Sequence, residues 1–63
     1  MTQKELLYLE DAISHEKNII SIINESISMV SSKRIINFLN NELSIHKKLY
    51  SSLLKHMEVC CDE

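Results

Sequence analysis

The sequence predicts an all-α fold in which one domain, residues 1–63, forms an antiparallel two-helix hairpin. None of the 63 residues is Gly or Pro, and tight β-hairpins, phosphate-binding loops and flexible linkers depend on these two residues. Apolar residues recur at spacings of three and four in two long stretches, as on one face of a helix. The phase of this spacing breaks once, within residues 31–34, which places a turn between two helices.

The first helix is expected over about residues 3–30. Thr2 followed by Glu5 is a capping-box pattern, in which the hydroxyl and the carboxylate each satisfy a free backbone N–H. The seam that follows is apolar except at its fourth position: Leu6, Leu9, Ile13, Glu16, Ile20, Ile23, Ile27 and Val30. Continuing this phase would place Arg34, Asn37 and Asn41 in the core, so the helix is expected to end before them.

The second helix is expected over about residues 34–58, after a turn at about residues 31–33 with Ser31 or Ser32 as the N-cap. Its seam is apolar except at His46: Ile35 or Ile36, Leu39, Leu43, His46, Leu49 or Tyr50, Leu53 and Met57. Acidic residues near the C-terminus oppose the helix dipole, which predicts a frayed tail over residues 59–63. The alternative is one continuous helix of about 60 residues in a long coiled coil, since no Gly or Pro forbids it.

A single hairpin is expected to need a partner. Chains of about 60 residues bury only about 60% of the surface that they expose when unfolded. Further apolar residues also broaden the two stripes beyond a two-helix seam: Leu7, Ile19, Ile22, Ile36, Ile45 and Leu54. Two hairpins packed as a four-helix bundle would cover them, so the sequence predicts a homodimer.

Charge and composition argue against several classes of protein. The formal net charge is −2 and the basic residues are scattered, which is not typical of a nucleic-acid-binding surface. No apolar run is long enough for a signal peptide or a membrane span. No Ser/His/Asp spacing suggests a nucleophile, so no catalysis is implied. Adjacent Cys60 and Cys61 cannot link distant segments, which indicates a cytoplasmic, reducing setting, with soft-metal binding or an interchain disulfide as lesser options.

The two polar seam positions are expected to meet. In a hairpin centred near residue 31, two residues lie at the same height when their numbers add to about 62, which pairs Glu16 with His46. Glu42 lies one helical turn from His46 on the same face. Two chains would therefore bring four carboxylates and two imidazoles together at mid-bundle.

Two hypotheses account for this polar layer. Glu16, Glu42 and His46 from two chains match the ligands of a dinuclear carboxylate-bridged Fe or Mn centre, with Tyr50 as an outer hydrogen-bond donor. Alternatively, Glu16 and His46 form a buried pair that sets the helix register, while Glu42 reaches solvent. Glu10, Asp11 and His15 are expected on a solvated face, and His56 is expected to be exposed.

Residues 4–17 and 38–50 resemble the small spore coat protein F-like chains of spore-forming bacteria, which belong with the ferritin-like helical folds. The resemblance covers residues 4–57. The ferritin-like pattern has one Glu on the first helix and Glu-x-x-His on the second, which Glu16 and His46 match. Leu43 departs from it, and Glu42 lies at i, i+4 from the histidine instead.

This resemblance implies a small non-catalytic structural or assembly protein, and it adds a spore coat to the cytoplasmic location that the cysteines indicate. The alternative is a ferritin-like metal-binding or ferroxidase unit that uses Glu16, Glu42 and His46 from two chains.

Overall fold

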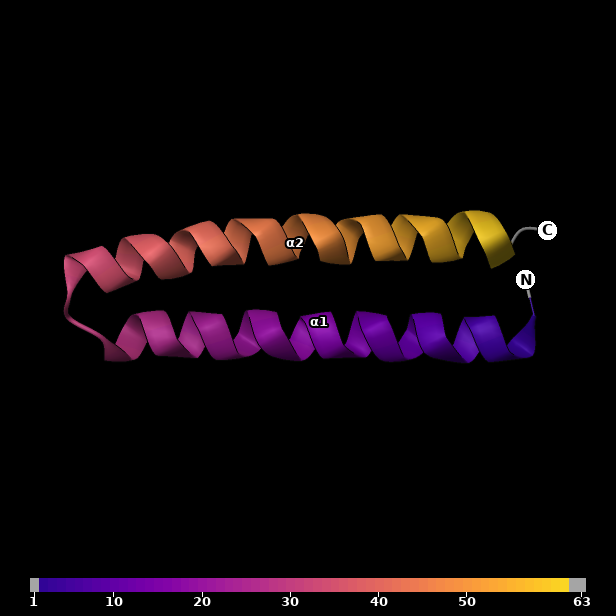
Figure 1. Cartoon of the computed structure of the whole chain (residues 1–63), viewed down its shortest axis with the longest axis horizontal. Helices are drawn as coiled ribbons and strands as arrows, with labels where there is room; N and C mark the ends of the chain where they lie inside the picture. The colour runs from indigo at the N-terminus through magenta and orange to yellow at the C-terminus, as the bar shows by residue number, and fades with distance from the viewer. Residues whose placement is uncertain (1, 62–63) are drawn as a thin grey trace.

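The computed structural model describes residues 2–61, with side chains to residue 59. It consists of two helices, α1 (Gln3–Met29) and α2 (Lys33–Cys61). They lie side by side and antiparallel, so both ends of the described chain lie at one end of a rod 47 Å long (Figure 1). The predicted all-α hairpin is confirmed. The alternative of one continuous helix is wrong, because residues 30–32 leave the helical conformation.

The start of α1 is capped as the sequence predicts. The Glu5 N–H donates to Thr2 Oγ1 at 3.2 Å, and the Thr2 hydroxyl donates to Glu5 Oε1 at 2.8 Å. The pKa of the Glu5 carboxyl lies below its ordinary value, first because of the Thr2 hydroxyl and then because of the Thr2 backbone N–H. Thr2 therefore satisfies a free donor of the first turn and holds the Glu5 carboxylate over that turn.

The turn between the helices covers residues 30–32. Val30 takes an extended conformation (φ −103°, ψ 147°) and ends α1. Ser32 caps α2, since its Oγ accepts from the Ile35 N–H at 3.4 Å and its carbonyl accepts from the Ile36 N–H at 3.0 Å. Of the two candidate serines, Ser32 is thus the N-cap.

The far end of α2 differs from the expected tail. The helix continues through residues 59–61, where fraying was expected, while residues 62 and 63 lie outside the described part of the chain. The acidic residues there disfavour the last turn only weakly, by about 1 kcal/mol or less each. No Gly or Pro is present to impose an earlier stop.

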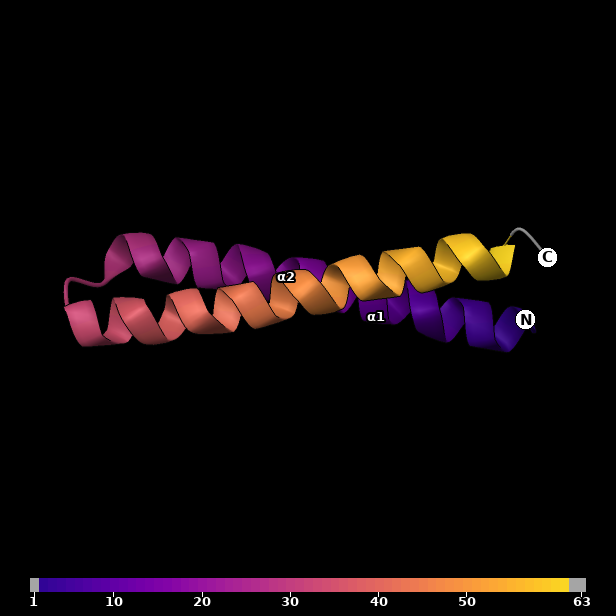
Figure 2. The same cartoon turned by 90° about the horizontal axis from the view of Figure 1, so that it is seen from above.

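The helices shield each other along the expected seams without enclosing a core. Ile36 and Tyr50 take the two seam positions that the sequence left open, since Ile35 and Leu49 are exposed. Figure 2 shows the helices crossing at a shallow angle, which keeps a heptad seam in contact along its length. Among the described residues, Ile23 is the only apolar side chain classed as buried, with 8% exposed. Neither described helix is apolar enough over a sufficient length to cross a bilayer.

Candidate functional site

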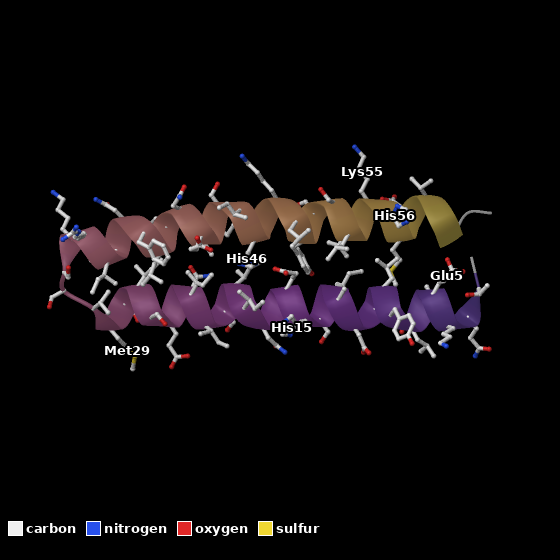
Figure 3. All side chains as sticks on the ribbon, in the orientation of Figure 1. Glu5, His15, Met29, His46, Lys55 and His56 are labelled. Atoms are coloured by element: carbon white, nitrogen blue, oxygen red, sulfur yellow. The ribbon has the colours of Figure 1, made fainter. Side chains whose placement is uncertain are left out.

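Glu16 and His46 meet at mid-height between the helices. The Nδ1 atom of His46 lies 2.6 Å from Oε2 of Glu16, and Figure 3 shows the imidazole pointing from α2 toward α1. Glu16 is only 8% exposed, as buried as Ile23. The predicted contact across the hairpin is therefore confirmed.

Glu42 approaches the same imidazole from the other side. Its Oε2 atom lies 3.8 Å from Nε2 of His46, and the two residues are one turn apart on α2. Glu42 is partly exposed, whereas Glu16 is buried. The imidazole thus lies between a buried carboxylate on Nδ1 and a half-exposed carboxylate near Nε2.

This arrangement determines where the hydrogen of His46 lies. An ionised carboxylate only accepts hydrogen bonds, so beside ionised Glu16 the Nδ1 atom carries a hydrogen and donates it. When His46 is the imidazolium, Nε2–H also faces Glu42, at a distance suited to an ion pair. No buried side-chain nitrogen or oxygen in the described part of the chain lacks a hydrogen-bond partner, so Glu16 is buried at a much smaller cost than an unpaired carboxylate.

The geometry within one chain does not fit a metal ion bound by all three residues. Glu16 and Glu42 contact opposite nitrogens of the His46 ring, so an ion on one nitrogen would be far from the carboxylate on the other. Among the side chains of residues 2–59, no group of three from His, Cys, Asp or Glu is arranged to hold a metal ion. The metal centre predicted between two chains needs ligands from a second chain and stays a prediction.

The remaining candidate residues lie away from this layer or on its edge. Glu10, Asp11, His15 and His56 are all exposed, as expected. Tyr50 is half-buried and borders an open groove with residues from both helices, Lys17, Ile20 and Lys47. The side chains of Cys60 and Cys61 lie outside the described part of the chain.

The sequence did not reveal which nitrogen of His46 faces which carboxylate. The i, i+4 spacing of Glu42 and His46 places both groups on one face, but the side-chain torsions that separate the two contacts leave no mark in the spacing. Comparison with protein-family models, with curated proteins and with solved structures gives no match to this chain.

Proposed function

We propose that this chain is a small non-catalytic structural or assembly protein, which works by pairing with a second copy in a four-helix bundle. The observation that carries the proposal is the lack of a core. Large apolar side chains remain exposed along both helices: Leu7, Tyr8, Ile22, Met29, Ile35, Phe38, Ile45, Leu49, Leu54 and Val59. Burying a side chain of this size contributes about 1.5–3 kcal/mol, so a partner that covers several of them adds most of the stability that one hairpin lacks.

In this proposal the polar layer sets the alignment of the two helices. A slip of one helix along the other would separate Glu16 from His46 and leave a buried carboxylate unpaired. An unpaired buried charge costs several kcal/mol, whereas apolar seam positions tolerate a slip from one layer to the next far better. The pair therefore selects one register, in the way that a single polar residue specifies register in a coiled coil.

The resemblance to the spore coat protein F-like chains supports the same type of role. A spore coat location belongs to the proposal on that ground, and a cytoplasmic location belongs to it because of the adjacent cysteines.

The dependence of thermal stability on protein concentration tests this function. A dimer that forms on folding is stabilised by mass action. The Tm should therefore rise by several degrees when the chain concentration is raised about a hundredfold, from about 5 to about 500 μM. The melts are followed by far-UV circular dichroism with a reducing agent present, so that no disulfide contributes. A Tm that does not change with concentration would contradict self-association.

A dinuclear Fe or Mn centre between two chains, with a ferritin-like role in metal binding or oxidation, is the second candidate. It is favoured by the gathering of two carboxylates around one imidazole at mid-hairpin, with Glu16 Oε2 2.6 Å from Nδ1 of His46 and Glu42 Oε2 3.8 Å from Nε2. Metal analysis of protein purified without a metal-chelating tag tests it, together with melts before and after addition of Fe(II) or Mn(II). Bound metal should raise the Tm of the wild type and not that of Glu42→Gln. Absence of both stoichiometric metal and a Tm rise would eliminate this candidate.

A further inference from the structure

The exposed apolar side chains of α1 are not spread evenly around the helix. Tyr8, Ile22 and Met29 follow a second stripe, which runs beside the seam with the same spacings of three and four. The half-buried Ala12 and Ile19 belong to the same stripe. His15 interrupts this stripe at its middle. Ser26 also belongs to it, and its hydroxyl donates to the Ile22 carbonyl at 2.8 Å, so covering Ser26 leaves no donor unsatisfied.

A matching second stripe runs along α2. Its apolar members follow the same alternating spacing from the turn to the end of the helix: Ile35, Phe38, Ile45, Leu49 and Val59. Glu42 lies within it near mid-hairpin, and Ser52 and His56 complete it. Each helix thus carries two heptad stripes, one facing the other helix and one facing outward.

The two second stripes lie on the same side of the hairpin. In an antiparallel helix pair, equivalent flanks of the two seams adjoin each other. The grooves show this directly, because Tyr8 and Ala12 of α1 border the same open groove as His56 of α2. On the other side, Lys17 of α1 adjoins Lys47 of α2. We call the ten apolar residues of the two second stripes the apolar face.

The opposite face of the hairpin is polar. The seam is flanked there by Gln3, Glu10, Lys17 and Asn24 on α1, and by Asn40 and Lys47 on α2. In the described part of the chain, the large apolar side chains exposed on this opposite face are Leu7 and Leu54. Only one face of the hairpin is therefore suited to apolar packing.

We propose that the apolar face is a dimer interface that takes a second copy of this chain, face to face, which refines the proposed self-association and rests on it. The accessible surface is 5044 Å² for a chain of 7.3 kDa, about 840 Å² more than the ~4,200 Å² of an average folded monomer of this mass. A standard interface buries about 800 Å² on each partner. The excess accessible surface of one hairpin thus roughly equals the area that one partner buries in a standard interface.

A second copy fits this face better than a charged partner does. The face carries few ionisable groups, Glu42 with His15 and His56 among them, so it lacks the concentrated charge that would select an acidic or basic ligand. A second copy supplies the same heptad spacing over the same length. Because the other face is polar, this pairing closes as a two-fold dimer and does not propagate into a filament.

Matched leucine substitutions on the two faces test the assignment. Leu49, on the apolar face, and Leu54, on the opposite face, are 43% and 41% exposed on the same helix. Placing a carboxylate in the interface leaves it without a partner, so Leu49→Glu should raise the dimer dissociation constant at least about 100-fold. Leu54→Glu should change it less than about threefold, since the side chain stays in water.

A second pair on α1 repeats the comparison. Ile22, on the apolar face, is 61% exposed, and Leu7, on the opposite face, is 56% exposed. Ile22→Glu should weaken the dimer as Leu49→Glu does, and Leu7→Glu should not. Dissociation constants come from sedimentation equilibrium of the full chain under reducing conditions, with circular dichroism recorded on the same samples.

Milder variants keep the test valid if a glutamate unfolds the chain. Leu49→Ala improves helix propensity, so the hairpin stays helical while the dissociation constant rises about tenfold, and Leu54→Ala leaves it unchanged. A wild-type chain that is monomeric would overturn the proposed function itself. A wild-type dimer that is weakened equally by substitutions on both faces, or more by those on the opposite face, would overturn only the assignment of the interface.

Discussion

Glu16 is as buried as Ile23, although it is a charged residue at a seam position where apolar side chains are the rule. Its position follows from the sequence, because a short turn near residue 31 dictates which residues of two antiparallel helices face each other. The details of the contact do not follow from it. The rotation of α2 about its axis decides which of two adjacent apolar residues enters the seam. The sequence leaves that rotation ambiguous at two places, Ile35 or Ile36 and Leu49 or Tyr50.

Removing either member of the buried pair should destabilise the fold, and removing both should not. His46→Leu leaves the Glu16 carboxylate buried without a donor and should cost about 3 kcal/mol. Glu16→Leu should cost less, about 1 kcal/mol, because the half-exposed imidazole keeps access to water and to Glu42. The double variant should lie within about 1 kcal/mol of the wild type. Urea unfolding at one fixed protein concentration measures all four free energies of unfolding.

Additive losses in the double variant would contradict a role of the pair in setting register. Glu42→Gln is the matched control, since it changes the partly exposed neighbour of His46 and leaves the Glu16 contact in place.

The first turn of α1 should show a dependence on pH. The folded-state pKa of Glu5 is lowered from 4.5 by the Thr2 hydroxyl and backbone N–H. A lowered folded-state pKa means that the ionised carboxylate stabilises the fold above about pH 4.5, and that this contribution is lost as the pH falls through the folded-state pKa. The difference in Tm between wild type and Glu5→Gln should therefore be larger at pH 6 than at pH 3. A difference that stays the same at both pH values would show that the Glu5 charge plays no part in the cap.

At the scale of the helices, the break between α1 and α2 follows from the phase of the apolar pattern and not from a breaker residue. Val30 becomes extended where the seam of α1 runs out, and α2 begins at Lys33, one residue before the expected start at residue 34, with Ser32 as its N-cap. The sequence therefore predicts the presence of a turn, but it does not fix the residue at which the turn begins. Without Gly at a C-cap, the last residue of a helix depends on packing that the apolar pattern does not record.

Two proline substitutions in α2, one at its first residue and one a turn further along, test the position of this break. Lys33 is the first helical residue of α2, a position whose N–H has no partner within the helix, so Lys33→Pro should leave the Tm nearly unchanged. Asn37→Pro, one turn further along, should cost about 3 kcal/mol because it removes a helical hydrogen bond and clashes with the preceding turn. Thermal melts by circular dichroism compare the two. An equal loss from both substitutions would place residue 33 inside a continuous helix.

At the scale of the whole molecule, the hairpin has one polar face and one apolar face, and over residues 2–59 only Glu16 and Ile23 are buried. The width of the apolar stripes predicts the need for a partner, as the sequence alone indicates. Only the packed hairpin shows that the stripes of both helices lie on one side, because that depends on how the seams of α1 and α2 face each other. The proposed function rests on the scarcity of buried apolar side chains in the described part of the chain, and the assignment of the interface rests on this one-sidedness.

The solution mass of the folded chain tests self-association most directly. Sedimentation equilibrium at neutral pH, under reducing conditions and at a concentration where circular dichroism shows the helices formed, should give twice the chain mass of 7.3 kDa. A mass of 7.3 kDa for a chain that is fully helical at the same concentration would contradict the dimeric bundle.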